Sequence, residues 1–92
     1  MMTNSYKWVD QWLSDEGHDP NMFNMYQKKM FADLATNGPQ GYSDLENKFE
    51  ISHTTVHDRL KQFMDIGWIN KEAQPTNRGR PIIKFCSIYE VE

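Results

Sequence analysis

Hydrophobic residues near the amino terminus recur at intervals of four. Trp8 and Trp12 are four residues apart, as are Val9 and Leu13, so the four side chains share one stripe of a helix. This spacing predicts a short amphipathic helix over residues 5–16. A glycine follows the helix and would end it, because glycine readily adopts the left-handed conformation of a C-cap.

A second apolar series follows a short linker at residues 17–20. Its members are again four residues apart, which predicts a helix over residues 21–37. Gly38 and Pro39 would end this helix, since proline lacks an amide donor and disfavours helical geometry in the residue before it. The series consists of Met22, Tyr26, Met30 and Leu34.

A capping signature introduces the next helix. Ser43 and Glu46 match the S-x-x-E capping box, in which the two side chains satisfy backbone amides at the first turn of a helix. Leu45 and Phe49 then face the same way. These features predict a short helix over residues 44–50.

A longer helix is predicted directly after a tight turn. Ser52 is a preferred N-cap residue, and Val56, Leu60 and Phe63 follow it at helical spacing. We therefore expect a helix over residues 53–66 that buries these three side chains and stops at the next glycine.

The spacing of hydrophobic residues is no longer helical beyond Gly67. Residues 68–72 and 82–89 are rich in β-branched and aromatic residues and are bounded by turn residues. The segment between them, residues 73–81, is too polar for a core and contains Arg78 and Arg80. Two strands joined by this basic loop form a hairpin, so the expected fold class is α+β.

The order of these elements resembles the winged helix-turn-helix regulators of bacteria and archaea, most closely their MarR-like and ArsR-like branches. The resemblance covers roughly two thirds of the chain, and it is the joint order of the fragments that makes it specific. The matching fragments are Gly38-Pro39, Tyr42-Ser43-Asp44-Leu45, Ile51-Ser52-His53-Thr54-Thr55-Val56, Asp65-Ile66-Gly67-Trp68-Ile69 and Asn77-Arg78-Gly79-Arg80-Pro81.

The resemblance implies a winged helix-turn-helix fold, with a three-helix core and a β-hairpin wing, in residues 21–92. Residues 1–20, an additional N-terminal helix and linker, lie outside the resemblance. The resemblance also implies sequence-specific binding of double-stranded DNA, in the manner of a transcriptional regulator. The recognition helix at 53–66 would enter the major groove, and the wing at 73–81 would contact the adjacent backbone or minor groove.

The candidate DNA-binding residues come from helix geometry and from the resemblance. At 100° per residue, the side opposite the buried face of the 53–66 helix carries Thr54, Asp58 and Lys61, continuing to Asp65. The family pattern implies base contacts from His53, Thr54, His57 and Asp58 and a phosphate contact from Lys61. The complete candidate set is Ser52, His53, Thr54, Thr55, His57, Asp58, Lys61, Arg78 and Arg80.

Charge is distributed unevenly along the chain. Its formal net charge is −3, but residues 1–47 have three basic and seven acidic residues, whereas residues 48–85 have seven basic and four acidic. A phosphate-binding surface needs local positive potential and not a basic total. The second half of the chain therefore agrees with nucleic-acid binding. The alternative is an ordinary scatter of surface charge.

Composition and motifs limit the classes of protein to which the chain can belong. Hydrophobic residues make up 38% of the chain, which is enough for a globular domain, and the single cysteine, Cys86, excludes an intrachain disulfide. There is no signal peptide or membrane-spanning stretch, so we expect a soluble cytoplasmic protein. No nucleophile–base pair or glycine-rich phosphate loop indicates an enzyme, and we expect no cofactor. His53 and His57 have a chelating spacing but lack further evident ligands, so no metal is expected.

Two questions about partners stay open in the sequence. The apolar side of the N-terminal helix could form a homodimer, presenting two recognition helices to half-sites about 34 Å apart, or it could fold back onto its own domain. The fold could also serve as a protein–protein interaction module without intrinsic DNA binding. The apolar side consists of Tyr6, Trp8, Val9, Trp12 and Leu13.

Overall fold

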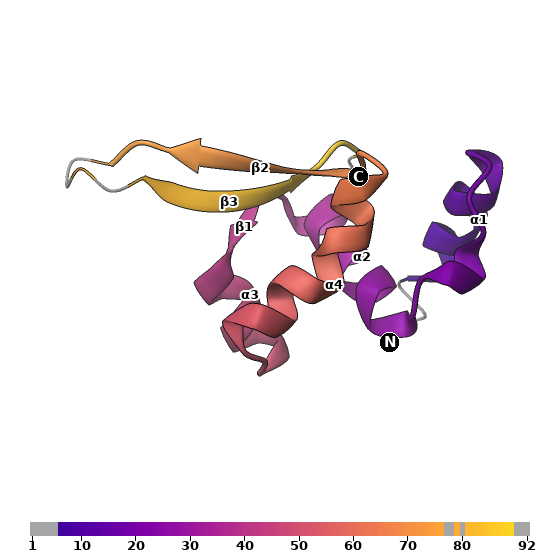
Figure 1. The fold of residues 1–92 in the computed structure, drawn as a ribbon, viewed down its shortest axis with the longest axis horizontal. Helices are drawn as coiled ribbons and strands as arrows, with labels where there is room; N and C mark the ends of the chain where they lie inside the picture. Colours follow the sequence, from indigo (N-terminus) through magenta and orange to yellow (C-terminus); the bar gives the residue numbers. More distant parts are fainter. Residues whose placement is uncertain (1–5, 77–78, 80, 90–92) are drawn as a thin grey trace.

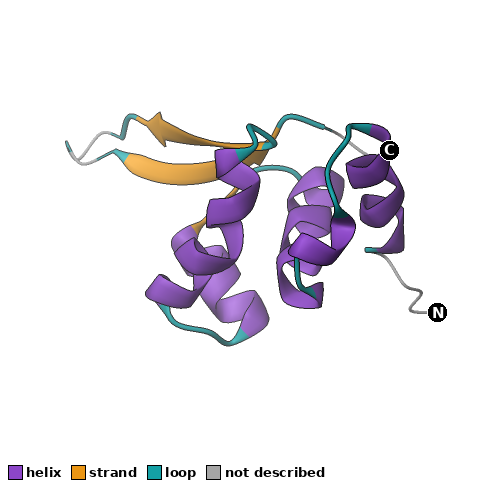
Figure 2. Cartoon of the chain, turned by 45° about the vertical axis from the view of Figure 1, so that its right-hand side comes forward, coloured by secondary structure: helices purple, strands orange, loops and turns teal. Residues whose placement is uncertain are grey.

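Helices and a small antiparallel sheet make up the protein, which is therefore α+β, as predicted (Figures 1 and 2). The structure is a computed structural model that describes residues 6–76, 79 and 81–89. The elements within these residues are α1 (Lys7–Asp15), the 3-10 helix η1 (Pro20–Met22), α2 (Met25–Asn37), β1 (Gln40–Gly41), α3 (Tyr42–Phe49), α4 (His53–Asp65), β2 (Ile69–Gln74) and β3 (Ile82–Ser87).

The sheet has the strand order β1-β3-β2, and both pairings are antiparallel. The hairpin of β2 and β3 was predicted, but β1 was not, because two residues are too few to show a period of two. Gly41 of β1 lies opposite Lys84, and a Cβ atom at this glycine would come within 3.2 Å of the carbonyl oxygen of Ile83. A side chain there would push β1 away from β3.

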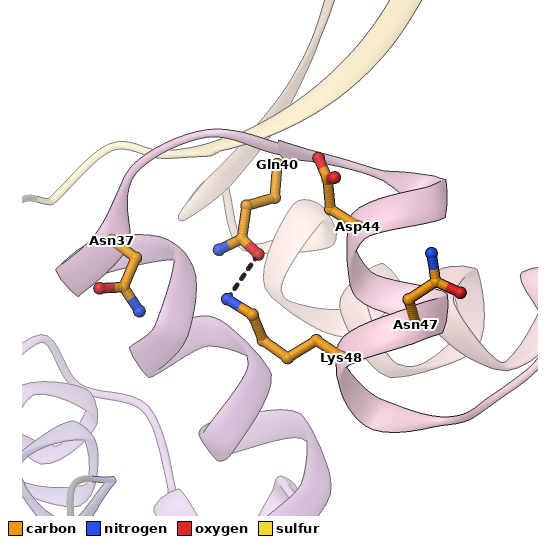
Figure 3. A pocket seen from close by; sticks show the side chains of 5 residues that line it. All are labelled: Asn37, Gln40, Asp44, Asn47 and Lys48. Carbon is orange, nitrogen blue, oxygen red and sulfur yellow. Dashed lines mark hydrogen bonds between the residues drawn. The ribbon is translucent and has the colours of Figure 1, made fainter.

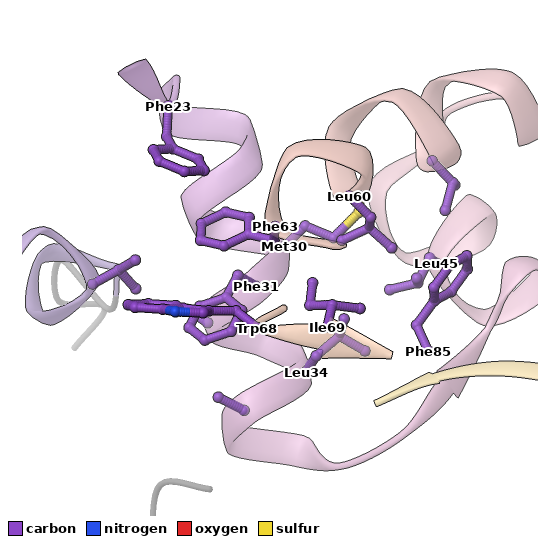
Figure 4. Packing of buried hydrophobic residues seen from close by; sticks show 14 of the residues in the cluster. Phe23, Met30, Phe31, Leu34, Leu45, Leu60, Phe63, Trp68, Ile69 and Phe85 are labelled. Atoms are coloured by element: carbon purple, nitrogen blue, oxygen red, sulfur yellow. The ribbon is translucent and has the colours of Figure 1, made fainter. Parts of the chain in front are cut away.

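Aromatic rings fill the core between α2, α4 and the start of β2 (Figure 4). Phe31 of α2 stacks on Phe63 of α4 with a centroid separation of 4.7 Å, and Trp68 packs 5.4 Å from Phe31. Val56, Leu60 and Phe63 are fully buried, so the predicted inner face of α4 is confirmed.

The N-terminal helix α1 packs against the core of its own chain. Val9 and Leu13 are fully buried in the same hydrophobic cluster as the α2 and α4 residues. Trp8 lies 6.1 Å from Phe31, and an ion pair of 2.6 Å joins Asp10 to Lys28 of α2. Within the single chain described, the apolar stripe of α1 covers its own domain.

The predicted start of α2 at residue 21 is wrong. Residues 20–22 form a separate 3-10 turn, and α2 begins at Met25. The cause is a capping box that the sequence reading missed: Asn24 Oδ1 accepts from the amide of Gln27 (2.8 Å), and Gln27 Oε1 accepts from the amide of Asn24 (2.6 Å). Two members of the predicted apolar series, Met22 and Tyr26, are exposed, at 67% and 52%.

The predicted cap of α3 is also wrong. Ser43 lies inside the helix, which starts at Tyr42, and it is the Asp44 carboxylate that accepts from the amide of Gly41 at 3.1 Å. Pairing of Gly41 with β3 fixes the start of the helix two residues earlier than the capping signature suggested. The hairpin differs as well, since β2 extends to Gln74 and β3 ends at Ser87.

Candidate nucleic-acid interface

A three-residue turn joins α3 to α4 and orients the two helices. Glu50 adopts the left-handed conformation (φ 57°), and the amide of Ile51 donates to the carbonyl of Glu46 at 3.1 Å. Ser52 then caps α4, because its Oγ accepts from the amide of Thr55 at 3.2 Å. The predicted role of Ser52 in opening this helix is confirmed, and the amino end of α4 faces solvent beside it.

The outer face of α4 matches the helical-wheel prediction. Thr54, Asp58 and Lys61 are exposed, and Thr55 and His57 are half-buried at the flanks. Asp65 continues the exposed row, whereas Arg59 and Gln62 are half-buried. The helix therefore presents a polar surface of neutral, acidic and basic side chains, with no apolar residue along its outer row.

His53 is positioned by two residues of α3. Its ring stacks on Tyr42 with centroids 3.7 Å apart, and its Nδ1 lies 3.1 Å from Glu46 Oε2. An ionised carboxylate only accepts hydrogen bonds, so Nδ1 carries the proton in this contact. With the proton on Nδ1 alone, Nε2 is an acceptor, and 62% of the His53 side chain is exposed.

The ring stack continues into the sheet. Tyr42 packs edge-on against Phe85 of β3 at 4.9 Å, and Phe85 is fully buried. Lys71 lies opposite Phe85 in the strand pairing, with its Nζ 5.8 Å from the ring centroid. Cross-strand partners project from the same face of a sheet, so Lys71 belongs to the side of the hairpin that carries this stack.

Three side chains near the candidate residues were thus missed in the sequence. Alternation along the hairpin could have identified Lys71, since it pairs with a buried aromatic residue. Tyr42 and Glu46 gave no such signal, because their contact with His53 depends on how the turn places α3 against α4.

Arg78 and Arg80 lie outside the described residues. Gly79 between them has φ +89°, and its amide lies 3.4 Å from the carbonyl oxygen of Thr76. Every residue of β2 after Ile69 is exposed, and the hairpin extends away from the helices (Figure 1). The described strands therefore project beyond the body of the domain.

A polar network fixes α3 against α2 and β1. Lys48 Nζ donates to Gln40 Oε1 at 2.9 Å (Figure 3). It also donates to Asp33 Oδ2 at 2.9 Å, and Gln40 Nε2 donates to Asp33 at 2.9 Å. These groups border an open hollow of about 560 Å³ that is also lined by Asn37, Asp44 and Asn47. Because the lysine is already paired within the protein, we assign the network a structural role in positioning α3.

Arg59 does not join the exposed row of α4. Its guanidinium lies 4.7 Å from the ring centroid of Tyr26, so it packs against the neighbouring helix α2. The outer face of α4 therefore has one basic residue, Lys61, within the described part of the chain.

The described residues were also compared with the requirements of a metal site and of a membrane-spanning helix. They contain no group of three or more side chains arranged to hold a metal ion, and none of their helices is long and apolar enough to cross a membrane. Burial raises the pKa of the Cys86 thiol, and a hydrogen bond to Glu72 acts in the same direction.

Comparisons with protein families, curated proteins and solved structures found no match to this chain. The functional interpretation therefore depends on the exposure, contacts and charge of its own residues.

Proposed function

We propose that residues 21–92 form a winged helix-turn-helix domain that binds duplex DNA sequence-specifically, as a transcriptional regulator does. The order α2-β1-α3-α4-β2-β3 agrees with this fold. The observation that carries the proposal is the exposed polar row of α4, held at the end of a tight helix–turn–helix unit and flanked by a projecting hairpin. A helix so presented fits the major groove, which is about 12 Å wide.

The chemistry of the row suggests which base edges it would contact. In its neutral form with the proton on Nδ1, His53 would offer Nε2 as an acceptor, and the Asp58 carboxylate only accepts. In the major groove the matching donors are the amino groups of cytosine and adenine. Thr54 and His57 would add further contacts. Because the acceptors match amino groups, the preferred half-site should place cytosine or adenine opposite the amino-terminal half of α4.

Basic residues would supply the contacts to phosphates. Lys61 lies on the exposed row of α4, and Lys71 lies on the hairpin side that carries the His53 stack. Arg78 and Arg80 of the wing would reach the adjacent backbone or minor groove. We propose a binding role without catalysis, a metal or a cofactor.

A homodimer stays part of the proposal, since two recognition helices would read two half-sites. Val9 and Leu13 cannot form its interface while they are buried in their own domain. Any contact between copies must therefore use the outer side of α1 or another surface. Sedimentation equilibrium of the full chain tests the dimer, and a monomer at high micromolar concentration would contradict it.

A protein–protein interaction module is the second candidate. It is favoured by Asp58 and Asp65, which place two negative charges on the exposed row of α4. Such a row would repel phosphates but suits a basic protein partner.

Salt-dependent binding to mixed-sequence duplex DNA separates the two candidates. Phosphate contacts release counterions, so the affinity of a DNA-binding protein should fall steeply as salt rises. The Arg78→Ala, Arg80→Ala double variant should reduce the salt slope by about two units. Lys7→Ala, which removes an exposed charge from α1, is the matched control and should leave the slope unchanged. A double variant that binds as tightly as the parent at every salt concentration refutes the proposed wing contacts, and salt-insensitive or absent binding by the parent refutes the DNA proposal.

A further inference from the structure

A small hollow lies between the end of α1 and Tyr89. It has a volume of about 230 Å³ and is lined by Trp12, Asp15, Glu16 and Tyr89. Sites for drug-sized ligands usually occupy roughly 300–1,000 Å³. The hollow therefore suits a single chemical group and not a large ligand.

Two aromatic rings form one wall of this hollow. Trp12 packs edge-on against Tyr89 with centroids 5.2 Å apart. Tyr89 also contacts Trp68 at 5.0 Å, and its backbone amide donates to Ser87 Oγ at 3.0 Å. The rings are thus held in place by their neighbours, and the electron-rich faces of such rings attract cations.

Two carboxylates form the other wall, at an electrostatically unfavourable place. Asp15 is the last residue of α1 and Glu16 is its C-cap, and no basic residue occupies the last turn. The carboxyl end of a helix has a partial negative charge, which favours cations and disfavours further acids. No described residue forms an ion pair with either carboxylate; Asp15 accepts one neutral hydrogen bond from Gln11 at 2.8 Å.

We propose that this hollow binds an organic cation, such as a guanidinium or alkylammonium group. Aromatic rings, carboxylates and the carboxyl end of a helix each favour positive charge, and residues of all three kinds line this hollow. The proposal does not depend on DNA binding, because none of the lining residues belongs to α4 or to the hairpin between residues 69 and 87.

The test is a titration of the full chain followed by nuclear magnetic resonance. Methylguanidinium, tetramethylammonium and the neutral tert-butanol are added separately, and the indole N–H signal of Trp12 is followed, with the amide of Thr54 on α4 as an internal reference. We expect saturable shifts at Trp12 with both cations, and none with the neutral probe. Shifts no larger than those from an equal concentration of sodium chloride would overturn the proposal.

Charge variants give the second half of the test. Asp15→Asn combined with Glu16→Gln should weaken cation binding about tenfold or more, because both nearby charges are lost. The matched control combines Asp58→Asn with Asp65→Asn, which changes the net charge equally at α4 and should leave binding unchanged. Equal affinities in the two double variants would overturn the site.

Folding does not confound this comparison, because the exchanged carboxylates are exposed. Removing two acids from the carboxyl end of α1 should leave the melting temperature unchanged or raise it. A further arm distinguishes the source of the cation. Capped arginine binding more tightly than methylguanidinium assigns the site to a side chain of a polypeptide, and weaker binding assigns it to a free small ligand; either result supports the cation site.

Discussion

Leu13 offers a direct test of whether α1 belongs to the folded unit. Its side chain is fully buried, and it lies in the same cluster as Phe31 and Phe63. Truncating a buried leucine to alanine costs about 2–5 kcal/mol, from the lost burial and the cavity left behind. A domain of this size has a total stability of about 5–14 kcal/mol. The Leu13→Ala variant should therefore lose a large fraction of its free energy of unfolding.

The assay is equilibrium unfolding in urea, followed by far-ultraviolet circular dichroism and by tryptophan fluorescence. The two signals should give the same midpoint, and the Leu13→Ala variant should shift this midpoint with an unchanged slope. Ser14→Ala is the matched control, because Ser14 is the next residue of α1 and is exposed. Its effect should stay within about 0.5 kcal/mol.

Two results would refute this reasoning. A Leu13→Ala variant within about 0.5 kcal/mol of the parent would mean that α1 unfolds separately from the rest. A midpoint that rises with protein concentration in the parent but not in the Leu13→Ala variant would mean that the buried side of α1 packs on a second copy, since association stabilises the folded state by mass action.

Three further outcomes follow from single contacts. Lys61→Ala should reduce the salt slope of DNA binding by about one unit, measured by fluorescence anisotropy, and an unchanged slope would remove this phosphate contact. Cys86, whose pKa is raised by burial and by Glu72, should be alkylated by iodoacetamide more slowly than free cysteine near pH 8. Glu72→Gln should lower that pKa and speed the reaction; a slower reaction would contradict the assignment. A double-mutant cycle of Arg59→Ala and Tyr26→Leu should give a coupling energy of about 0.5–1 kcal/mol. Additive changes in the free energy of unfolding would show that the two side chains do not stabilise each other.

The faces of α4 were predictable because helical periodicity alone determines them. Val56, Leu60 and Phe63 repeat at helical spacing and are buried, and this leaves Thr54 and Lys61 on the opposite side. The burial of a helix face requires no knowledge of which element covers it. For the same reason the hydrophobic stripe of α1 was found correctly, although its two possible partners could not be separated.

Features that depend on contacts distant in the sequence were not predictable. β1 exists because Gln40 and Gly41 meet β3 more than forty residues later. That pairing also decides between two adjacent capping residues, so that Asp44 caps α3 and Ser43 does not. The His53 stack on Tyr42 likewise requires the turn between α3 and α4 to be already formed.

The unequal lengths of the strands have a mechanical consequence for the hairpin. β3 has a strand on both sides only at Lys84 and Phe85, where β1 pairs with it. Farther out, Ala73 and Ile83 belong to a ribbon of two strands, with no third strand to resist torsion. Two-stranded ribbons twist more than wider sheets do. The hairpin thus has a base held by three strands and an outer half held by two, so its outer half can twist relative to α4 while the aromatic core stays in place.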